Sequence, residues 1–150
     1  ARFDIYGTGD AAEDIQTLIR ELHLEESVSF SNMFFPVQEI PAMLSGASVG
    51  IIPNRQDPAT ELMLPVKLLE YLYCGIAVVA PKLDAIEHYF PEDSIAYYSA
   101  GDVQSCAEAI CAVLGEPSRR EKQAALREEF FKNFSWDVMK HHLYAAVDAI

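Results

Sequence analysis

The chain has 150 residues, of which 51% are hydrophobic and 23% are charged, as in a globular domain long enough to bury a core. Its formal net charge of −12 argues against nucleic acid as a partner, because a phosphate backbone is bound by a basic surface. No apolar run approaches the roughly 20 residues that span a bilayer, and three cysteines without framework spacing favour a reducing, cytoplasmic compartment.

Apolar residues recur with the period of strands and the period of helices in turn along the chain. In chain order, the pattern predicts a strand at 2–7, a helix at 11–24, a strand at 27–31, a short helix starting near Pro41 within 37–47, a strand at 48–53, a polar loop at 54–63, a helix at 64–74, strands at 77–81 and 94–99, and helices at 102–114, 118–132 and 135–149. Short strands that alternate with helices predict an α/β fold with a Rossmann-like, doubly wound parallel sheet.

Three residues mark expected helix boundaries. Gly75 is expected to end the helix at 64–74, Pro117 to begin the helix at 118, and Ser135 to cap the last helix. Residues 1–150 contain no repeat, low-complexity tract or Gly/Ser linker, so a single domain is expected. Because the chain opens on a strand, we expect the first βα unit of the sheet and a preceding domain to lie outside these residues.

The carboxyl ends of the strands are the expected ligand-binding edge, as in other open α/β sheets. The segments that follow the strands are GTGD (7–10), SNMFF (31–35), PNRQD (53–57), the start of the helix at 64–74, and PKLD (81–84). Between Arg20 and Arg119 the basic residues are Arg55, Lys67 and Lys82, and all three belong to this edge. An anionic ligand is therefore expected there.

The GTG sequence that begins at Gly7 is a weak signal for nucleotide binding. It lacks the third glycine of a dinucleotide fingerprint, and Asp10 follows it directly and would repel a pyrophosphate. A tight strand-to-helix turn is the better interpretation. The functional alternative is that the backbone approaches a ligand at this turn.

The segment LPVKLLEY (64–71) is a stronger signal. Lys67 falls in the first turn of a helix, where the dipole disfavours a cation by about 0.3–1 kcal/mol, so a bound phosphate or diphosphate is expected beside it. Glu70 lies one turn further on the same face, where its carboxylate suits the two hydroxyl groups of a ribose. The alternative is a surface pair between Lys67 and Glu70 of about 0.2–0.5 kcal/mol, or neutralisation of Lys67 by Glu61.

The segments FDIYGTGD, LHLEESVSFSNMFFPVQEIPAMLSGASVGIIP, LPVKLLEYLYCGIAVVA and FSW together resemble the C-terminal, donor-binding half of GT-B-fold glycosyltransferases of the family 4 type. The resemblance covers nearly the whole chain. Its most specific part lies in the third of these segments, at Pro65, Lys67, Glu70, Tyr71, Gly75, Val78 and Val79.

The resemblance implies roles for individual residues. The second glutamate of the family's Glu-x7-Glu motif binds the donor ribose and corresponds to Glu70, whereas the first would fall on Leu62, with Glu61 one residue away. Residues 32–34 correspond to a segment that contacts the base. We therefore expect Lys67 to bind the donor and also to have a catalytic role. The other expected donor-binding residues are Glu70, Leu64, Val66, Glu61, Met33, Gly7 and Arg55.

The resemblance also implies the reaction. A hexosyl group would pass from a UDP- or GDP-sugar to a glycan or lipid-linked acceptor in polysaccharide biosynthesis, with retention of configuration and without metal or cofactor. Lys67 and the helix N-terminus would stabilise charge on the leaving diphosphate. The acceptor, and any peripheral contact with the inner membrane face, would belong to the N-terminal lobe, so residues 1–150 alone are expected to be inactive and to insert into no membrane. The alternatives are a GT-B nucleotide-sugar 2-epimerase and a non-catalytic α/β interaction module.

Overall fold

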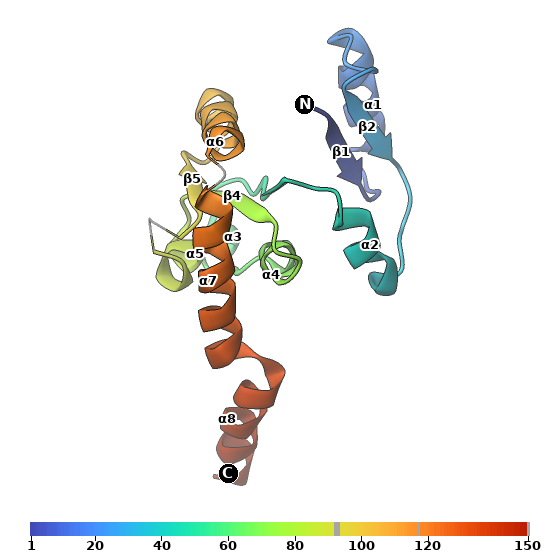
Figure 1. The fold of residues 1–150 in the computed structure, drawn as a ribbon. Helices are drawn as coiled ribbons and strands as arrows, with labels where there is room; N and C mark the ends of the chain where they lie inside the picture. The colour runs from blue at the N-terminus through green and yellow to red at the C-terminus, as the bar shows by residue number, and fades with distance from the viewer. Residues whose placement is uncertain (92–93, 117, 150) are drawn as a thin grey trace. The chain divides into compact units, whose positions relative to one another are not determined.

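The structure is a computed structural model that describes residues 1–91, 94–116 and 118–149. It divides into two compact units, Ala1–Met43 and Leu44–Ile150, which we describe separately (Figure 1). The prediction for Pro117 falls outside the described residues.

The first unit begins with a parallel βαβ arrangement. β1 (Phe3–Tyr6) pairs with β2 (Val28–Ser31), and α1 (Ala12–Glu21) connects them. α1 ends three residues before the predicted end because His23 adopts a left-handed conformation with φ 53°. The amide groups of His23 and Leu24 then donate to the carbonyl oxygens of Arg20 and Ile19 at 3.1 and 2.9 Å, which closes the helix in a Schellman motif.

A short helical segment follows β2. η1 (Val37–Glu39) leads directly into α2 (Ile40–Leu44). Pro41 lies in the first turn of α2, as predicted, where its missing amide hydrogen costs no helical hydrogen bond.

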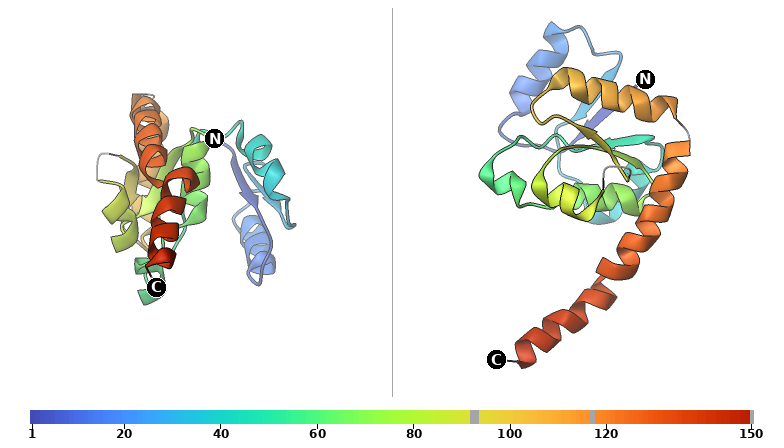
Figure 2. Two further views of the ribbon diagram at one scale, coloured as in Figure 1. Left: turned by 90° about the horizontal axis from the view of Figure 1, so that it is seen from below. Right: turned by 90° about the vertical axis from the view of Figure 1, so that its left-hand side faces the viewer.

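The second unit is built around a parallel sheet in the order β3-β4-β5. β3 (Val49–Ile51) and β5 (Ala96–Tyr98) flank β4 (Ala77–Pro81), whose five residues are all buried. Val78 and Ala80 of β4 belong to a core shared with α4 (Val66–Tyr73), α5 (Asp84–Tyr89) and α7 (Ser118–Phe134). Ala77 and Val79 belong to a second core under α6 (Val103–Gly115). Helices thus cover both faces of the sheet, which confirms the predicted doubly wound arrangement (Figure 2).

α4 packs closely against β3 and β4. Its buried residues are Leu68 and Leu72, and the ring of Tyr71 lies over Gly50 of β3, where a Cβ would come within 2.3 Å of the ring. Gly75 ends α4 with φ 71°, and the amide of Ile76 donates to the carbonyl of Tyr71 at 2.9 Å. The predicted glycine cap is confirmed.

The remaining boundaries agree with the predictions, with three differences. The segment predicted as a loop at 54–63 contains one helical turn, α3 (Pro58–Glu61), and α5 was not predicted. Ser135 does precede α8 (Trp136–Asp148), but its side chain accepts no capping hydrogen bond. Among the described residues no helix is long and apolar enough to cross a membrane.

Candidate functional site

The N-terminus of α4 has no side-chain cap. Its N-cap residue is Pro65, which is buried and has an extended backbone with φ −67° and ψ 126°. The amide of Leu68 donates back to the carbonyl of Pro65 at 3.0 Å. Within residues 1–91, 94–116 and 118–149, the amides of Val66 and Lys67 have no hydrogen-bond acceptor. Two backbone donors are therefore available at the positive end of the helix dipole.

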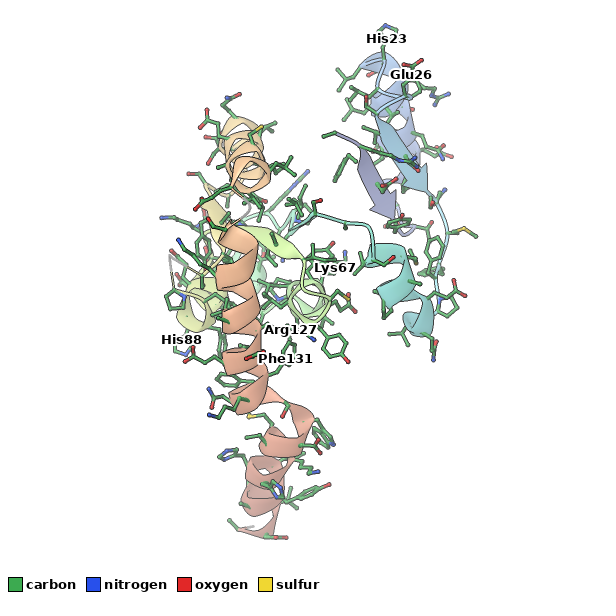
Figure 3. All side chains as sticks on the ribbon, viewed as in Figure 1. His23, Glu26, Lys67, His88, Arg127 and Phe131 are labelled. Carbon is green, nitrogen blue, oxygen red and sulfur yellow. The ribbon has the colours of Figure 1, made fainter. Side chains whose placement is uncertain are left out.

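Lys67 adds a full positive charge to this helix end. Its side chain is exposed, and the first turn of α4 contains no acidic residue (Figure 3). In the described part of the chain Lys67 forms no ion pair within 4.0 Å, so the alternative pairing with Glu70 is not formed. A helix N-terminus and an unpaired lysine together attract an anion.

Glu70 lies one turn along α4 and is half-buried. The neighbouring Tyr71 has its pKa raised by burial and, to a smaller extent, by the negative charge of Glu70. Because Tyr71 is held against Gly50, the helix turn that carries Glu70 is fixed on the sheet. Glu70 is thus a partly exposed carboxylate on a rigid element, which suits an acceptor of hydroxyl hydrogen bonds.

The other predicted residues of the second unit surround the start of α4 in sequence. Leu64 packs against the main core, whereas Val66 is 68% exposed. Arg55 is exposed, and its carbonyl oxygen accepts a hydrogen bond of 2.6 Å from the hydroxyl group of Thr60. The structure therefore leaves the Val66 and Arg55 side chains open to a ligand and uses Leu64 for packing.

α3 is held by a capping box that the sequence contains. The Asp57 carboxylate accepts from the amides of Ala59 and Thr60 at 2.8 and 3.0 Å, and the Thr60 hydroxyl accepts from the amide of Asp57 at 2.9 Å. These amide donors hold the pKa of Asp57 below its ordinary value, with Thr60 contributing most. The result is a rigid turn directly before α4.

Glu61 uses both carboxylate oxygens within the chain. One oxygen accepts from the side-chain amide of Gln56 at 2.7 Å, and the other from the backbone amide of Asp84, the first residue of α5, at 2.9 Å. The Asp84 amide and then the Gln56 side chain lower the pKa of Glu61. Sequence reasoning placed Glu61 near the donor but did not anticipate these partners. Leu62 beside it is 83% exposed.

Gly7 and Met33 belong to the first unit. Gly7 follows β1 with φ 125°, and its amide donates to the carbonyl of Ser31 at 3.2 Å. Met33 follows β2 and is 55% exposed. Both residues lie at the carboxyl ends of two paired parallel strands, which is the edge predicted for them.

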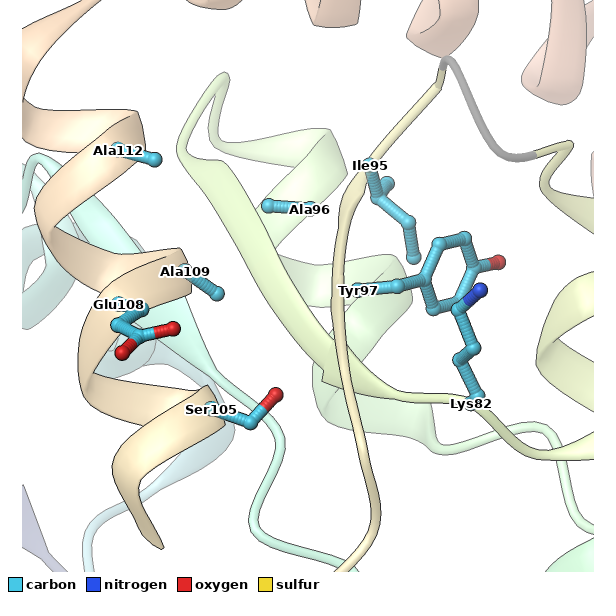
Figure 4. A pocket seen from close by; sticks show the side chains of 8 residues that line it. All are labelled: Lys82, Ile95, Ala96, Tyr97, Ser105, Glu108, Ala109 and Ala112. Atoms are coloured by element: carbon cyan, nitrogen blue, oxygen red, sulfur yellow. The ribbon is translucent and has the colours of Figure 1, made fainter. Parts of the chain in front are cut away.

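Lys82 lines a pocket of the second unit between β5 and α6, which has a volume of about 430 Å³ (Figure 4). The pocket is also lined by Ile95, Ala96, Tyr97, Ser105, Glu108, Ala109 and Ala112. Neither Lys67 nor Glu70 lines it. Among the described residues, no group of three or more His, Cys, Asp or Glu side chains is placed to hold a metal ion.

A doubly wound parallel sheet with an open, positively charged helix end is typical of the nucleotide-binding lobes of Rossmann-like proteins. The family described as "Glycosyl transferases group 1" matches residues 1–116, so the chain belongs to this glycosyltransferase family. The fold is that of a Rossmann-like lobe of a GT-B enzyme.

Individual relatives agree with this assignment. Chitobiosyldiphosphodolichol beta-mannosyltransferase of Debaryomyces hansenii is 22% identical in an alignment of 142 residues that covers 89% of this chain and 29% of the relative. The structure of Anabaena HepE in complex with UDP-glucose is similar with a TM-score of 0.85 and 15% identity, over 99% of this chain and 41% of HepE.

Sucrose-phosphate synthase from Thermosynechococcus elongatus is similar with a TM-score of 0.77 and 21% identity, over 97% of this chain and 38% of the synthase. The chain spans less than half the length of each of these three proteins.

Proposed function

We propose that this chain binds the nucleoside diphosphate of a sugar donor and that the full-length protein transfers the glycosyl group. The observation that carries the proposal is the N-terminus of α4. It presents two amides without acceptors in the described chain and an exposed Lys67 without an ion-pair partner there, with no acidic residue in the first turn. An unliganded cation at this place is unfavourable, and a diphosphate would make it favourable.

Residues near the N-terminus of α4 in the sequence complete the proposed donor site. Glu70 would accept hydrogen bonds from the ribose, one turn inside the diphosphate, and Arg55 would add positive charge. For Gly7 and Met33, which belong to the first unit, contact with the donor stays a prediction from the sequence. Membership of the glycosyltransferase family and the UDP-glucose bound by the HepE relative support a nucleotide-sugar donor.

The chemistry follows from where charge develops. As the glycosidic bond to the diphosphate breaks, negative charge accumulates on the leaving oxygen, and donors that are already oriented toward it lower the barrier. Lys67 and the first amides of α4 would supply this stabilisation without a metal. We further propose a hexosyl donor, retention of configuration, and a glycan or lipid-linked acceptor bound by another lobe of a cytoplasmic or membrane-peripheral enzyme.

The test is nucleotide binding by the full-length protein and its Lys67→Ala variant, measured by calorimetry with UDP and GDP. Loss of a charged hydrogen bond of about 1.5–3 kcal/mol should weaken diphosphate binding about ten- to a hundredfold. Uridine and guanosine, which lack the diphosphate, should bind the parent and the variant alike. Lys132→Ala, which removes an exposed lysine from the last turn of α7, is the matched control and should change neither affinity.

The stability of the unliganded protein gives a second readout. Lys67→Ala should leave the melting temperature unchanged or slightly higher, because the variant removes a cation from the positive helix end. A lower melting temperature together with an unchanged nucleotide-induced shift would refute the diphosphate site.

A further inference from the structure

The segment 53–63 connects β3 to the proposed donor site, and most of its hydrogen bonds are internal. The Asp57 cap and the Thr60–Arg55 bond both stay within the segment. Among the described residues, one hydrogen bond joins this segment to another part of the protein: the Asp84 amide donates to the Glu61 carboxylate. The residues joined are 23 positions apart in sequence.

α5 depends on the same bond. Its own N-cap residue, Leu83, has no side-chain oxygen and makes no capping bond. The Asp84 amide at the start of α5 is instead satisfied by the Glu61 carboxylate, at 2.9 Å. A carboxylate at a helix N-terminus is favoured both as an acceptor and by the helix dipole. α5 is in turn fixed to the sheet, because Leu83, Ile86 and Phe90 are fully buried.

Glu61 therefore bridges the two loops that follow the adjacent parallel strands β3 and β4. One oxygen holds α5, and the other holds Gln56 at the beginning of the 53–63 segment. Three residues after Glu61 the chain reaches Leu64 and enters α4, whose first amides and Lys67 form the proposed diphosphate site.

We infer that Glu61 is a positioning residue of the donor site: its carboxylate fixes the 53–63 segment against α5 and thereby sets the direction in which the chain enters α4. This inference rests on the proposed function, because the site that it positions is the diphosphate site at α4. In this role Glu61 acts through the loop, because each of its carboxylate oxygens accepts a hydrogen bond from within the chain.

The variant that tests this role in the full-length protein is Glu61→Gln, which has nearly the same shape but replaces one acceptor oxygen by an NH₂ group that cannot accept. It removes at least one of the two bonds. The control is Glu87→Gln, which removes the same charge from the first turn of α5 but breaks no hydrogen bond of the described chain. Gln56→Ala is a milder variant that leaves the bond to Asp84 in place.

Two measurements are needed for each variant: the affinities for UDP and GDP by calorimetry, and hydrogen exchange of residues 53–63 and of the Asp84 amide. Glu61→Gln is expected to speed exchange at both places and to weaken binding of the nucleotide that the parent binds by about threefold or more, the size of effect that residues without ligand contact exert. Gln56→Ala should do the same to a smaller extent, and Glu87→Gln should match the parent.

The outcomes separate this inference from the proposed function. If Lys67→Ala weakens nucleotide binding but Glu61→Gln only speeds exchange, the donor site stands and the positioning role is refuted. If Glu61→Gln weakens binding without faster exchange, Glu61 contacts the ligand directly and the positioning role is also refuted. If the parent binds neither UDP nor GDP, or if Lys67→Ala has no effect, the proposed function fails and this inference fails with it.

Discussion

Replacing Gly50 by alanine should destabilise the second unit, because the added methyl group has no room. An ideal Cβ at this position would lie 2.3 Å from Cδ2 and 2.5 Å from Cγ of Tyr71. These atoms belong to the base of the ring, so relief requires the ring or α4 itself to move. Overpacking of this kind costs about 1–3 kcal/mol.

A double-mutant cycle with Tyr71→Ala isolates the contact. Without the ring, Gly50→Ala should leave the free energy of unfolding unchanged or raise it by up to about 1 kcal/mol, since alanine loses less conformational entropy in a strand than glycine. The expected coupling free energy is therefore about 1–4 kcal/mol. The assay is urea unfolding of the parent, both single variants and the double variant, with hydrogen exchange of β3 and α4 reporting on this unit.

The result that would refute this reasoning is an equal cost of Gly50→Ala with and without the Tyr71 ring. It would mean that the methyl group is accommodated by the strand and that α4 is not held at its present distance by Gly50. Nucleotide binding by the same variants tests a second consequence. Because Glu70 and Lys67 lie on α4, Gly50→Ala should also weaken UDP or GDP binding, and Tyr71→Ala should relieve that part of the loss.

Two further predictions concern single carboxylates. Glu70→Ala should reduce nucleotide affinity by about 1.5–3 kcal/mol with little change in melting temperature, and calorimetry with unchanged affinity would exclude the ribose contact. Asp57 has a lowered pKa in the folded protein, so its ionised cap stabilises α3 above the unfolded pKa of about 4, and this stability is lost as the pH falls through the lower folded value. Asp57→Asn keeps a capping oxygen but does not titrate, so its melting temperature should fall below that of the parent at pH 6 and approach it near pH 3; a constant difference would show that ionisation of Asp57 is irrelevant.

The sequence predicted those elements whose signals are local. β4 was placed at its observed residues because the apolar run AVVAP (77–81) comes two residues after the glycine that ends α4. α3 was missed although its signal is present: Asp57 as N-cap, Pro58 in the first position and Thr60 at the third. Four residues are too short for a helical period to be recognised, so only the capping pattern could have revealed this turn.

α5 could not be predicted in the same way. It has six residues, and its N-cap residue Leu83 gives no capping signal, because the carboxylate that serves this purpose comes from Glu61. The distance in sequence between Glu61 and its partner Asp84 also explains why the site prediction was incomplete. Lys67 stood out through the scarcity of other basic residues, whereas the partners of Glu61 depend on how two loops meet in space.

The sequence of β4 has a consequence for how the strand finds its register. Ala77, Val78, Val79 and Ala80 read the same in both directions, so each face of the strand presents one alanine and one valine to its core. A slip by one residue normally exchanges apolar and polar side chains, but here it would leave the two faces nearly alike. The pairing of β4 must therefore be selected at its ends. Ile76 is tied to Tyr71 at one end, and at the other Pro81 offers no amide hydrogen while Lys82 donates to the carbonyl of Tyr98.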